Sequence, residues 1–268
     1  MQHVACISYG KDSAVIPELC LRHDLPLDRI VTADIWATPT IPADNPKMVE
    51  WKAEFDEKIF KRYGIKVEHH STHKCEGIVG DRVSFEECFY RKITRGKHIG
   101  TIKGFPMVKG NWCTKLKLTA LAEVHKQADV VYLGICVDEP KRVERLKGTK
   151  KVALPAQLGY TEADCFNLAE ELGLLAPSYQ SASRGGCWFC HNQGIDQLRK
   201  LRKNYPEYWQ LMLKWDKDSP VKFRTDGHTV HDLDRRFFLE DEGFIDADKP
   251  FRWSMLNEPY VQLEFGKE

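Results

Sequence analysis

The stretch Val4–Val15, VACISYGKDSAV, interrupts an apolar run with a short polar segment before apolar residues resume. Its first part, Val4–Ile7, has the composition of a short buried β-strand. Apolar residues at helical spacing in Ala14–Arg22 predict a helix directly afterwards. The order strand, tight loop, helix is therefore the first structural prediction from the sequence.

The polar segment of this stretch indicates an anion site. Gly10 allows close approach of the backbone, and the first N–H groups of the following helix point into the loop. Lys11, Ser8 and Ser13 add hydrogen-bond donors, so phosphate is the expected ligand. The spacing is neither a Walker A nor a GxGxxG motif. A purely structural turn, capped by Asp12 and Ser13, is the alternative.

Length, net charge and cysteine count limit the classes of protein to which the chain can belong. A chain of 268 residues suffices for one large α/β domain, alone or with a smaller attachment. The net charge of +1 favours no particular nucleic-acid or membrane partner, and no long apolar run or leader sequence is present. We therefore expect a cytoplasmic protein. Nine cysteines, an odd number, then indicate core residues, metal ligands or reactive thiols rather than a disulfide framework.

Strands alternate with helices along the first half of the chain. Strands are predicted at Arg29–Ile35, Ile65–His69 and Ala128–Cys136, and an amphipathic helix at Pro46–Tyr63 that ends at Gly64. This alternation predicts an α/β fold with a doubly wound, mainly parallel sheet. We expect residues 1–180 to form the nucleotide-binding domain, and residues 181–268 to form a small, mostly helical C-terminal region that contains the CxxC motif.

In such sheets, ligands bind beyond the carboxyl ends of the strands. The loop Ser8–Ser13, Asp34 and the residues after Cys136 should therefore surround one crevice. Between Glu87 and Glu123 the chain has no acidic residue but many basic ones. This basic stretch predicts either a solvated surface or a contact with phosphate or nucleic acid.

Four segments, in order, resemble the phosphoadenosine phosphosulfate (PAPS) reductase-like branch of the PP-loop superfamily, the adenine nucleotide alpha-hydrolase group, and its prophage-type members in particular. The first is the PP-loop itself, SYGKDS. The resemblance covers about residues 1–195, with these segments: Ser8–Ser13, Gly134–Arg142, Leu154–Cys165 and Leu174–Tyr179.

The resemblance implies a HUP-type fold that binds ATP or a PAPS-like adenine nucleotide, with phosphates in the loop and adenine near Asp34. Cys136 stands where the family has arginine and Pro140 where it has serine, which alters anion recognition. The implied nucleotide-binding residues are Ser8, Tyr9, Gly10, Lys11, Asp12, Ser13, Asp34 and Gly134. The implied catalytic residues are Lys11, Asp12, Lys115 and Arg142.

The CxxC motif, Cys187 and Cys190, has the spacing of a metal chelate. The segment around Cys113 is similar to the cysteine segment of the iron–sulfur members, with Trp112 in place of their first cysteine. The predicted ligands are thus Cys113, Cys187 and Cys190, holding a 4Fe-4S cluster with one open iron. Two alternatives remain. One is structural Zn²⁺ with a fourth ligand from Cys88, Cys75 or His191, and the other is thiols without metal.

His69, His70, His73 and Cys75 form a second group with ligand chemistry, in EHHSTHKCEG. A strand end with exposed imidazoles is the favoured interpretation, and a second metal site is the alternative.

The cysteine pattern also distinguishes a sulfonucleotide reductase from an ATP-cleaving enzyme. Sulfonucleotide reductases attack with a cysteine in a C-terminal tail, and this chain has no cysteine after Cys190. The expected activity is therefore that of an enzyme that cleaves ATP between the α and β phosphates, with Mg²⁺ on the triphosphate, and adenylylates an acceptor, with sulfur transfer as the next step. The alternatives are a PAPS reductase with a non-standard thiol and a non-catalytic nucleotide- or nucleic-acid-binding module with structural zinc. The acceptor, a small molecule or a nucleic acid, and the oligomeric state, a homo-oligomer included, stay open.

Overall fold

The chain forms two compact units. The computed structural model describes residues 1–72, 82–106, 112–177 and 186–257. The first unit comprises Met1–Cys88 and Trp112–Trp188, and the second comprises Phe89–Asn111 and Phe189–Glu268. Across the described ranges, no helix has both the length and the apolar character that crossing a bilayer requires.

The first unit is built on a five-stranded sheet in the order β3-β2-β1-β4-β5, and every neighbouring pair is parallel. The prediction of a doubly wound α/β fold is confirmed. The chain runs from β1 to β2 and β3 on one side and to β4 and β5 on the other, so the carboxyl ends of β1 and β4 flank the switch point where such folds bind ligands. The strands are β1 (His3–Ile7), β2 (Arg29–Ala33), β3 (Val67–His70), β4 (Val130–Leu133) and β5 (Lys151–Ala153).

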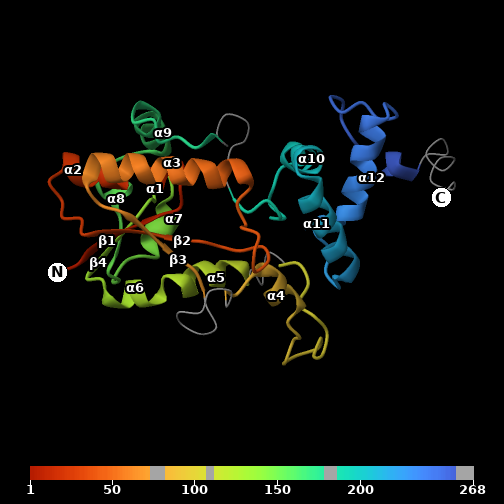
Figure 1. Cartoon of the computed structure of the whole chain (residues 1–268), viewed down its shortest axis with the longest axis horizontal. Coiled ribbons are helices and arrows are strands. Elements are labelled where there is room, and N and C mark those ends of the chain that lie inside the picture. The colour runs from red at the N-terminus through yellow and green to blue at the C-terminus, as the bar shows by residue number, and fades with distance from the viewer. Residues whose placement is uncertain (73–81, 107–111, 178–185, 258–268) are drawn as a thin grey trace. The chain divides into compact units, whose positions relative to one another are not determined.

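Helices cover both faces of this sheet, as Figure 1 shows for α3 and α9 on one face and α6 on the other. Burial on both faces explains why the three central strands, β2, β1 and β4, are mainly apolar. The first face carries α2 (Ile16–Arg22), α3 (Pro46–Tyr63), α8 (Leu154–Gln157) and α9 (Glu162–Glu171). The second face carries α5 (Cys113–Ala120) and α6 (Ala122–Gln127).

Helix α3 matches its predicted bounds at both ends. The Asn45 side chain accepts a hydrogen bond from the backbone N–H of Met48, and Pro46 occupies the first turn, where its missing N–H costs nothing. Gly64 ends the helix in the left-handed conformation, with φ of 71°. The side chains that the helix buries against the sheet are Met48, Trp51, Phe55 and Ile59.

The helix after the first loop differs from the prediction. It begins earlier, at Lys11, and is divided at Val15 into α1 (Lys11–Ala14) and α2. Pro17 has no N–H to offer the carbonyl of Ser13, and that carbonyl instead accepts from the N–H of Val15. The single turn α1 is therefore separated from the longer helix behind it.

A buried ion cluster joins α2 to α3. Glu18 is only 3% exposed and accepts hydrogen bonds from Arg62 (3.0 Å), Tyr63 (2.7 Å) and Arg22 (2.9 Å). Burial by itself raises the pKa of Glu18, but these donors outweigh it and lower the pKa to about 2. The carboxylate therefore stays ionised across the physiological range and links the two helices.

The second unit is helical and aromatic, as the C-terminal sequence predicts. Trp209 and Trp215 are buried, and the ring of Trp215 lies 6.2 Å from that of Phe89 and 5.7 Å from that of Phe189. These contacts place the segment that begins at Phe89 in this unit. Its helices are α10 (Ile195–Asn204), α11 (Pro206–Asp218), α12 (Val230–Asp241) and a 3-10 helix (Trp253–Asn257). Helix α4 (Phe85–Tyr90) begins in the first unit and ends in the second.

Candidate functional site

The loop Ser8–Ser13 closes on itself through its two serines. The Ser8 N–H donates to the Ser13 hydroxyl oxygen (3.0 Å), the two hydroxyls lie 3.1 Å apart, and the Ser13 hydroxyl donates to the carbonyl of Gly10 (3.1 Å). Gly10 is the extended N-cap of α1, and no side chain caps it. The loop thus presents the amino end of α1 beyond strand β1, as the sequence predicts.

Tyr9 has a strained backbone at the centre of this loop. Its φ is 56°, which costs a bulky residue roughly 1–2 kcal/mol. The side chain is held in place because its ring packs edge-on against Phe55 (5.0 Å between centroids) and its hydroxyl donates to Asp56 (2.9 Å). Strain that the surroundings maintain is typical of functional loops.

Lys11 is held at the start of α1 by two carboxylates. Its ammonium group lies 2.6 Å from Asp12 and 2.8 Å from Glu162 of α9. Burial lowers the pKa of Lys11, but the hydrogen bonds and charges of these two carboxylates raise it above its usual value. Lys11 is therefore a fixed cation next to the loop.

Gly134, directly after β4, lies against the backbone of the loop helix. A Cβ atom at this position would stand 2.5 Å from the Ser13 nitrogen and 2.6 Å from the Asp12 carbonyl carbon. Real Cβ atoms essentially never approach backbone atoms so closely, so only glycine fits here. The close approach requires glycine for packing, and the predicted role of Gly134 in nucleotide binding stays a prediction.

On the β2–β3 side of the loop, His69 bridges two carboxylates. Its Nδ1 lies 2.8 Å from Asp34 and its Nε2 lies 2.8 Å from Asp56. The hydrogen bonds to Asp34 and Asp56 outweigh partial burial and raise the pKa of His69 to about 9. At neutral pH the ring is therefore an imidazolium with both nitrogens occupied, an arrangement that does not suit a metal ligand.

Lys52 completes this group. Its ammonium group donates to Asp44 and to Asp34 (3.4 Å), and it lies 4.8 Å from the centre of the Tyr9 ring. Burial lowers the pKa of Lys52, but the charges of Asp44 and Asp34 outweigh it and raise the pKa. We call this group the charged cluster, and its members are Asp34, Asp44, Lys52, Asp56 and His69.

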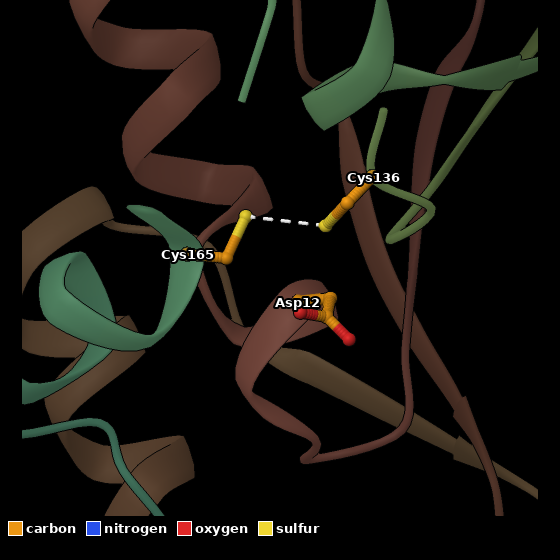
Figure 2. Close-up of side chains that lie close together, drawn as sticks. All are labelled: Asp12, Cys136 and Cys165. Atoms are coloured by element: carbon orange, nitrogen blue, oxygen red, sulfur yellow. Dashed lines mark hydrogen bonds between the residues drawn. The ribbon is translucent and has the colours of Figure 1, made fainter. Parts of the chain in front are cut away.

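On the β4 side, two thiols and a carboxylate converge (Figure 2). Cys136 follows β4, Cys165 lies on α9, and their sulfurs are 3.5 Å apart; both residues are fully buried. One oxygen of Asp12 and the two sulfurs all lie within 4.8 Å of one another. The hydrogen bond to Cys165, together with burial, raises the pKa of the Cys136 thiol well above its usual value.

The other predicted site residues lie on separate elements. Arg142 is on α7 (Pro140–Glu144) and pairs with Glu139. Lys115 is exposed on α5. Their catalytic roles stay predictions.

The predicted cluster cysteines are divided between the units. Cys113 opens α5, and Cys187 and Cys190 belong to the first and second units, respectively. All three are half-buried, and no disulfide joins the cysteines within the described part of the chain. The next residue after Cys187, Trp188, is anchored through its N–H groups to the carbonyls of Ala43 and Pro42 (2.9 Å each). Their joint role as ligands stays a prediction, and the alternative ligand Cys75 lies outside the described residues.

The fold is that of a doubly wound α/β protein, with the loop Ser8–Ser13 at its switch point. Comparison with known proteins adds little: no protein-family profile and no curated sequence matches the chain. Among solved structures, the chain is similar to U34-tRNA thiolase NcsA from Methanococcus maripaludis, determined with its 4Fe-4S cluster. The match has 15% identity and a TM-score of 0.39 and covers 81% of this chain and 72% of the thiolase.

Proposed function

We propose that this chain is an enzyme that binds ATP through the loop Ser8–Ser13 and transfers its adenylyl group to an acceptor. An acceptor oxygen attacks the α-phosphorus, the bond to the β-phosphate breaks, and pyrophosphate leaves with the electron pair. The acceptor proton passes to solvent or to a nearby base. Adenylylation turns that oxygen into a leaving group for a later nucleophile.

The observation that carries the proposal is the loop at the switch point of the sheet. The amino end of α1, the two serine hydroxyls and the fixed cation Lys11 all lie there. Backbone donors, hydroxyls and a cation are the groups that bind phosphates. The close contact of Gly134 with the loop leaves no room for a side chain at that position.

The charged cluster supports recognition of the polar part of the nucleotide. It combines residues at the carboxyl ends of β2 and β3 with Lys52 and Asp56 of α3, next to Tyr9, where the family resemblance implies adenine. Asp34 and His69 combine acceptors and donors in one rigid network. Such a network can select a hydrogen-bonding base or ribose by pairing with its edge.

Mg²⁺, which the resemblance implies, suits the carboxylates near the loop. One carboxylate oxygen of Glu139, Oε2, is buried with no hydrogen-bond partner in the described structure. Oxygen ligands of this kind are those that Mg²⁺ prefers. Asp12, Asp138 and Glu139 are the residues that would hold the ion, which would neutralise charge on the departing pyrophosphate.

Nucleotide binding is tested by calorimetry with ATP, ADP and PAPS in the presence of Mg²⁺, followed by assays for AMP and pyrophosphate with bulk tRNA and small-molecule acceptors. Lys11→Ala should weaken ATP binding by about tenfold or more, because it removes a charge-assisted hydrogen bond to phosphate. The control Lys147→Ala removes an exposed lysine that pairs with Glu144 (2.6 Å) and should leave binding unchanged.

The outcomes separate the three activities. AMP and pyrophosphate support the proposal. Binding of PAPS without ATP cleavage would favour the reductase alternative. Failure of all three nucleotides to bind folded protein would reject the nucleotide site.

The finer part of the proposal is sulfur transfer from a 4Fe-4S cluster at Cys113, Cys187 and Cys190. Three half-buried cysteines outside any disulfide fit such a cluster chemically. A bound cluster with an open iron would supply a carrier for sulfide. The test is anaerobic purification with assays of iron, acid-labile sulfide and zinc. Brown protein that loses iron and sulfide in Cys187→Ser supports it, and colourless protein with zinc lost in that variant would make the cysteines structural.

A further inference from the structure

The thiols of Cys136 and Cys165 and the carboxylate of Asp12 come from three different parts of the first unit. Figure 2 shows the two sulfurs pointing toward one another, with Asp12 beside them on α1. The sequence gives no sign of this group, because Cys136 and Cys165 lie 29 residues apart and each is compatible with a core position. The fold thus creates a set of three metal-ligating groups.

The spacing of the sulfurs is close to that of two thiolate ligands on one metal ion. Two thiolates on a tetrahedral Zn²⁺ lie about 3.8 Å apart, because each Zn–S bond is about 2.3 Å. The observed separation is 3.5 Å. A disulfide has an S–S separation of about 2.05 Å, so the two sulfurs are not bonded to each other in this structure.

The charges around the group also suit a divalent cation. Two thiolates and a carboxylate carry three negative charges; Zn²⁺ would balance two of them, and the ammonium group of Lys11, which Asp12 shares with Glu162, lies 2.6 Å from the third. Charge balance is what a buried site requires. Lys11 would then orient the Asp12 carboxylate from outside the metal, as partners of metal ligands commonly do.

We propose that Asp12, Cys136 and Cys165 form a binding site for a thiophilic divalent cation of the Zn²⁺ class. Each thiol loses its proton to solvent as its sulfur bonds to the metal, and water takes the fourth position. The side chain of Asp12 is 24% exposed, whereas the two cysteines are fully buried, so the ion enters past Asp12. The bound ion fixes α1 to α9 and to the residues after β4. With Asp12 on this ion, Asp138 and Glu139 are left to hold Mg²⁺, so this inference does not depend on the proposed function.

The test uses the full chain, expressed with zinc and measured by elemental analysis, and then reloaded with Co²⁺ to record thiolate-to-metal charge-transfer absorption. The Cys187→Ser background disrupts the two-thiol chelate of the CxxC motif, Cys187 and Cys190. In this background we expect about one equivalent of zinc, lost in Cys165→Ala. Asp12→Asn should weaken zinc binding by about tenfold or more, because it removes an anionic ligand. The matched control Cys20→Ala removes another buried thiol, on α2, and should keep the metal.

Absence of zinc and cobalt from folded Cys187→Ser protein would overturn the proposal, and so would a folded Cys165→Ala variant that keeps its zinc. Circular dichroism establishes folding in each case. If Cys165→Ala does not fold, Cys165→Ser, which preserves the volume, and Asp12→Asn decide the question by the same metal measurements. Because the readout is metal content, its result is independent of whether ATP is cleaved.

Discussion

The two sides of the loop Ser8–Ser13 differ in the chemistry of the residues that contact it. The β2–β3 side carries the charged cluster, in which Asp34, Asp56 and Lys52 are fixed around His69. The β4 side carries a glycine, a buried thiol pair and a carboxylate: Gly134, Cys136, Cys165 and Asp12.

The difference shows how one loop is supported in two ways. Ion pairs and hydrogen bonds between side chains stabilise the β2–β3 side, so a substitution there changes the electrostatic balance and leaves the backbone in place. On the β4 side, Gly134 packs directly against the backbone of the loop, so one added methyl group there must displace backbone atoms. The largest effects are therefore expected on the β4 side.

The largest predicted effect is that of Gly134→Ala. Its new methyl group would overlap backbone atoms of Asp12 and Ser13 at about 2.5 Å. We expect a loss of about 3 kcal/mol in the free energy of unfolding, since overpacking against backbone has no cheap relief. Urea unfolding measures it. The control Gly148→Ala meets no atom within 4 Å and bears only the cost of its φ of +73°, about 1 kcal/mol. Equal losses in the two variants would contradict the close-contact interpretation.

The next effect is that of His69→Phe on the β2–β3 side. The substitution leaves Asp34 and Asp56 without the cation between them, at a site where the imidazole side chain is 39% exposed. Solvent screening limits the loss to roughly 1–2 kcal/mol. The double variant with Asp56→Asn should recover part of the loss in thermal unfolding, because one unbalanced charge is removed. No recovery would mean that packing, and not charge, decides stability at this position.

The pH dependence of stability tests whether the charge of His69 stabilises the β2–β3 side. The folded pKa of His69, about 9, lies above its ordinary value of 6.5. Its stabilising contribution is therefore complete below pH 6.5 and is lost as the pH rises through 9. After screening we expect a change of roughly 1 kcal/mol. Unfolding of wild type and His69→Asn from pH 6 to about 9.5 should converge at the alkaline end, and an NMR titration midpoint of His69 near 6.5 would contradict the bridge.

The smallest effect is expected for Tyr9→Phe. The ring keeps its contacts with Phe55 and Lys52, and the hydroxyl loses its bond to Asp56 (2.9 Å) and a longer contact with His69 (3.4 Å). Such a bond contributes about 1 kcal/mol. Tm should fall by a few degrees with the circular dichroism spectrum unchanged, whereas a loss as large as that of Gly134→Ala would show that the hydroxyl maintains the strained backbone.

Much of the fold follows from local sequence. The strand, loop and helix at the N-terminus and the helix Pro46–Tyr63 are visible because apolar spacing, Asn45 and Gly64 all act over a few residues. Strand β5 (Lys151–Ala153) is missed, since three residues at a sheet edge carry no periodic signal. The division at Val15 is also missed, although Pro17 is the signal that could have predicted it.

The site is predictable only in part, because its side chains meet through tertiary contacts. The loop Ser8–Ser13 and Asp34 were found as residues at strand ends. Asp56 lies on the polar side of a helix and looks like any solvated carboxylate until the fold brings it to His69. For the same reason, the sequence at His69 and His70 predicts an exposed strand end, and it gives no sign that the His69 imidazolium bridges Asp34 and Asp56.

The separation of α1 from α2 at Val15 has a consequence for local motion. Because Pro17 removes the hydrogen bond that would continue the helix, the single turn Lys11–Ala14 can open while α2 stays wound on the sheet. Amide hydrogens of α1 should therefore exchange with deuterium much sooner than those of α2. Any ligand or ion that bridges α1 to its neighbours would slow this exchange. The exchange rate of the α1 amides would then show whether the site at the loop is occupied.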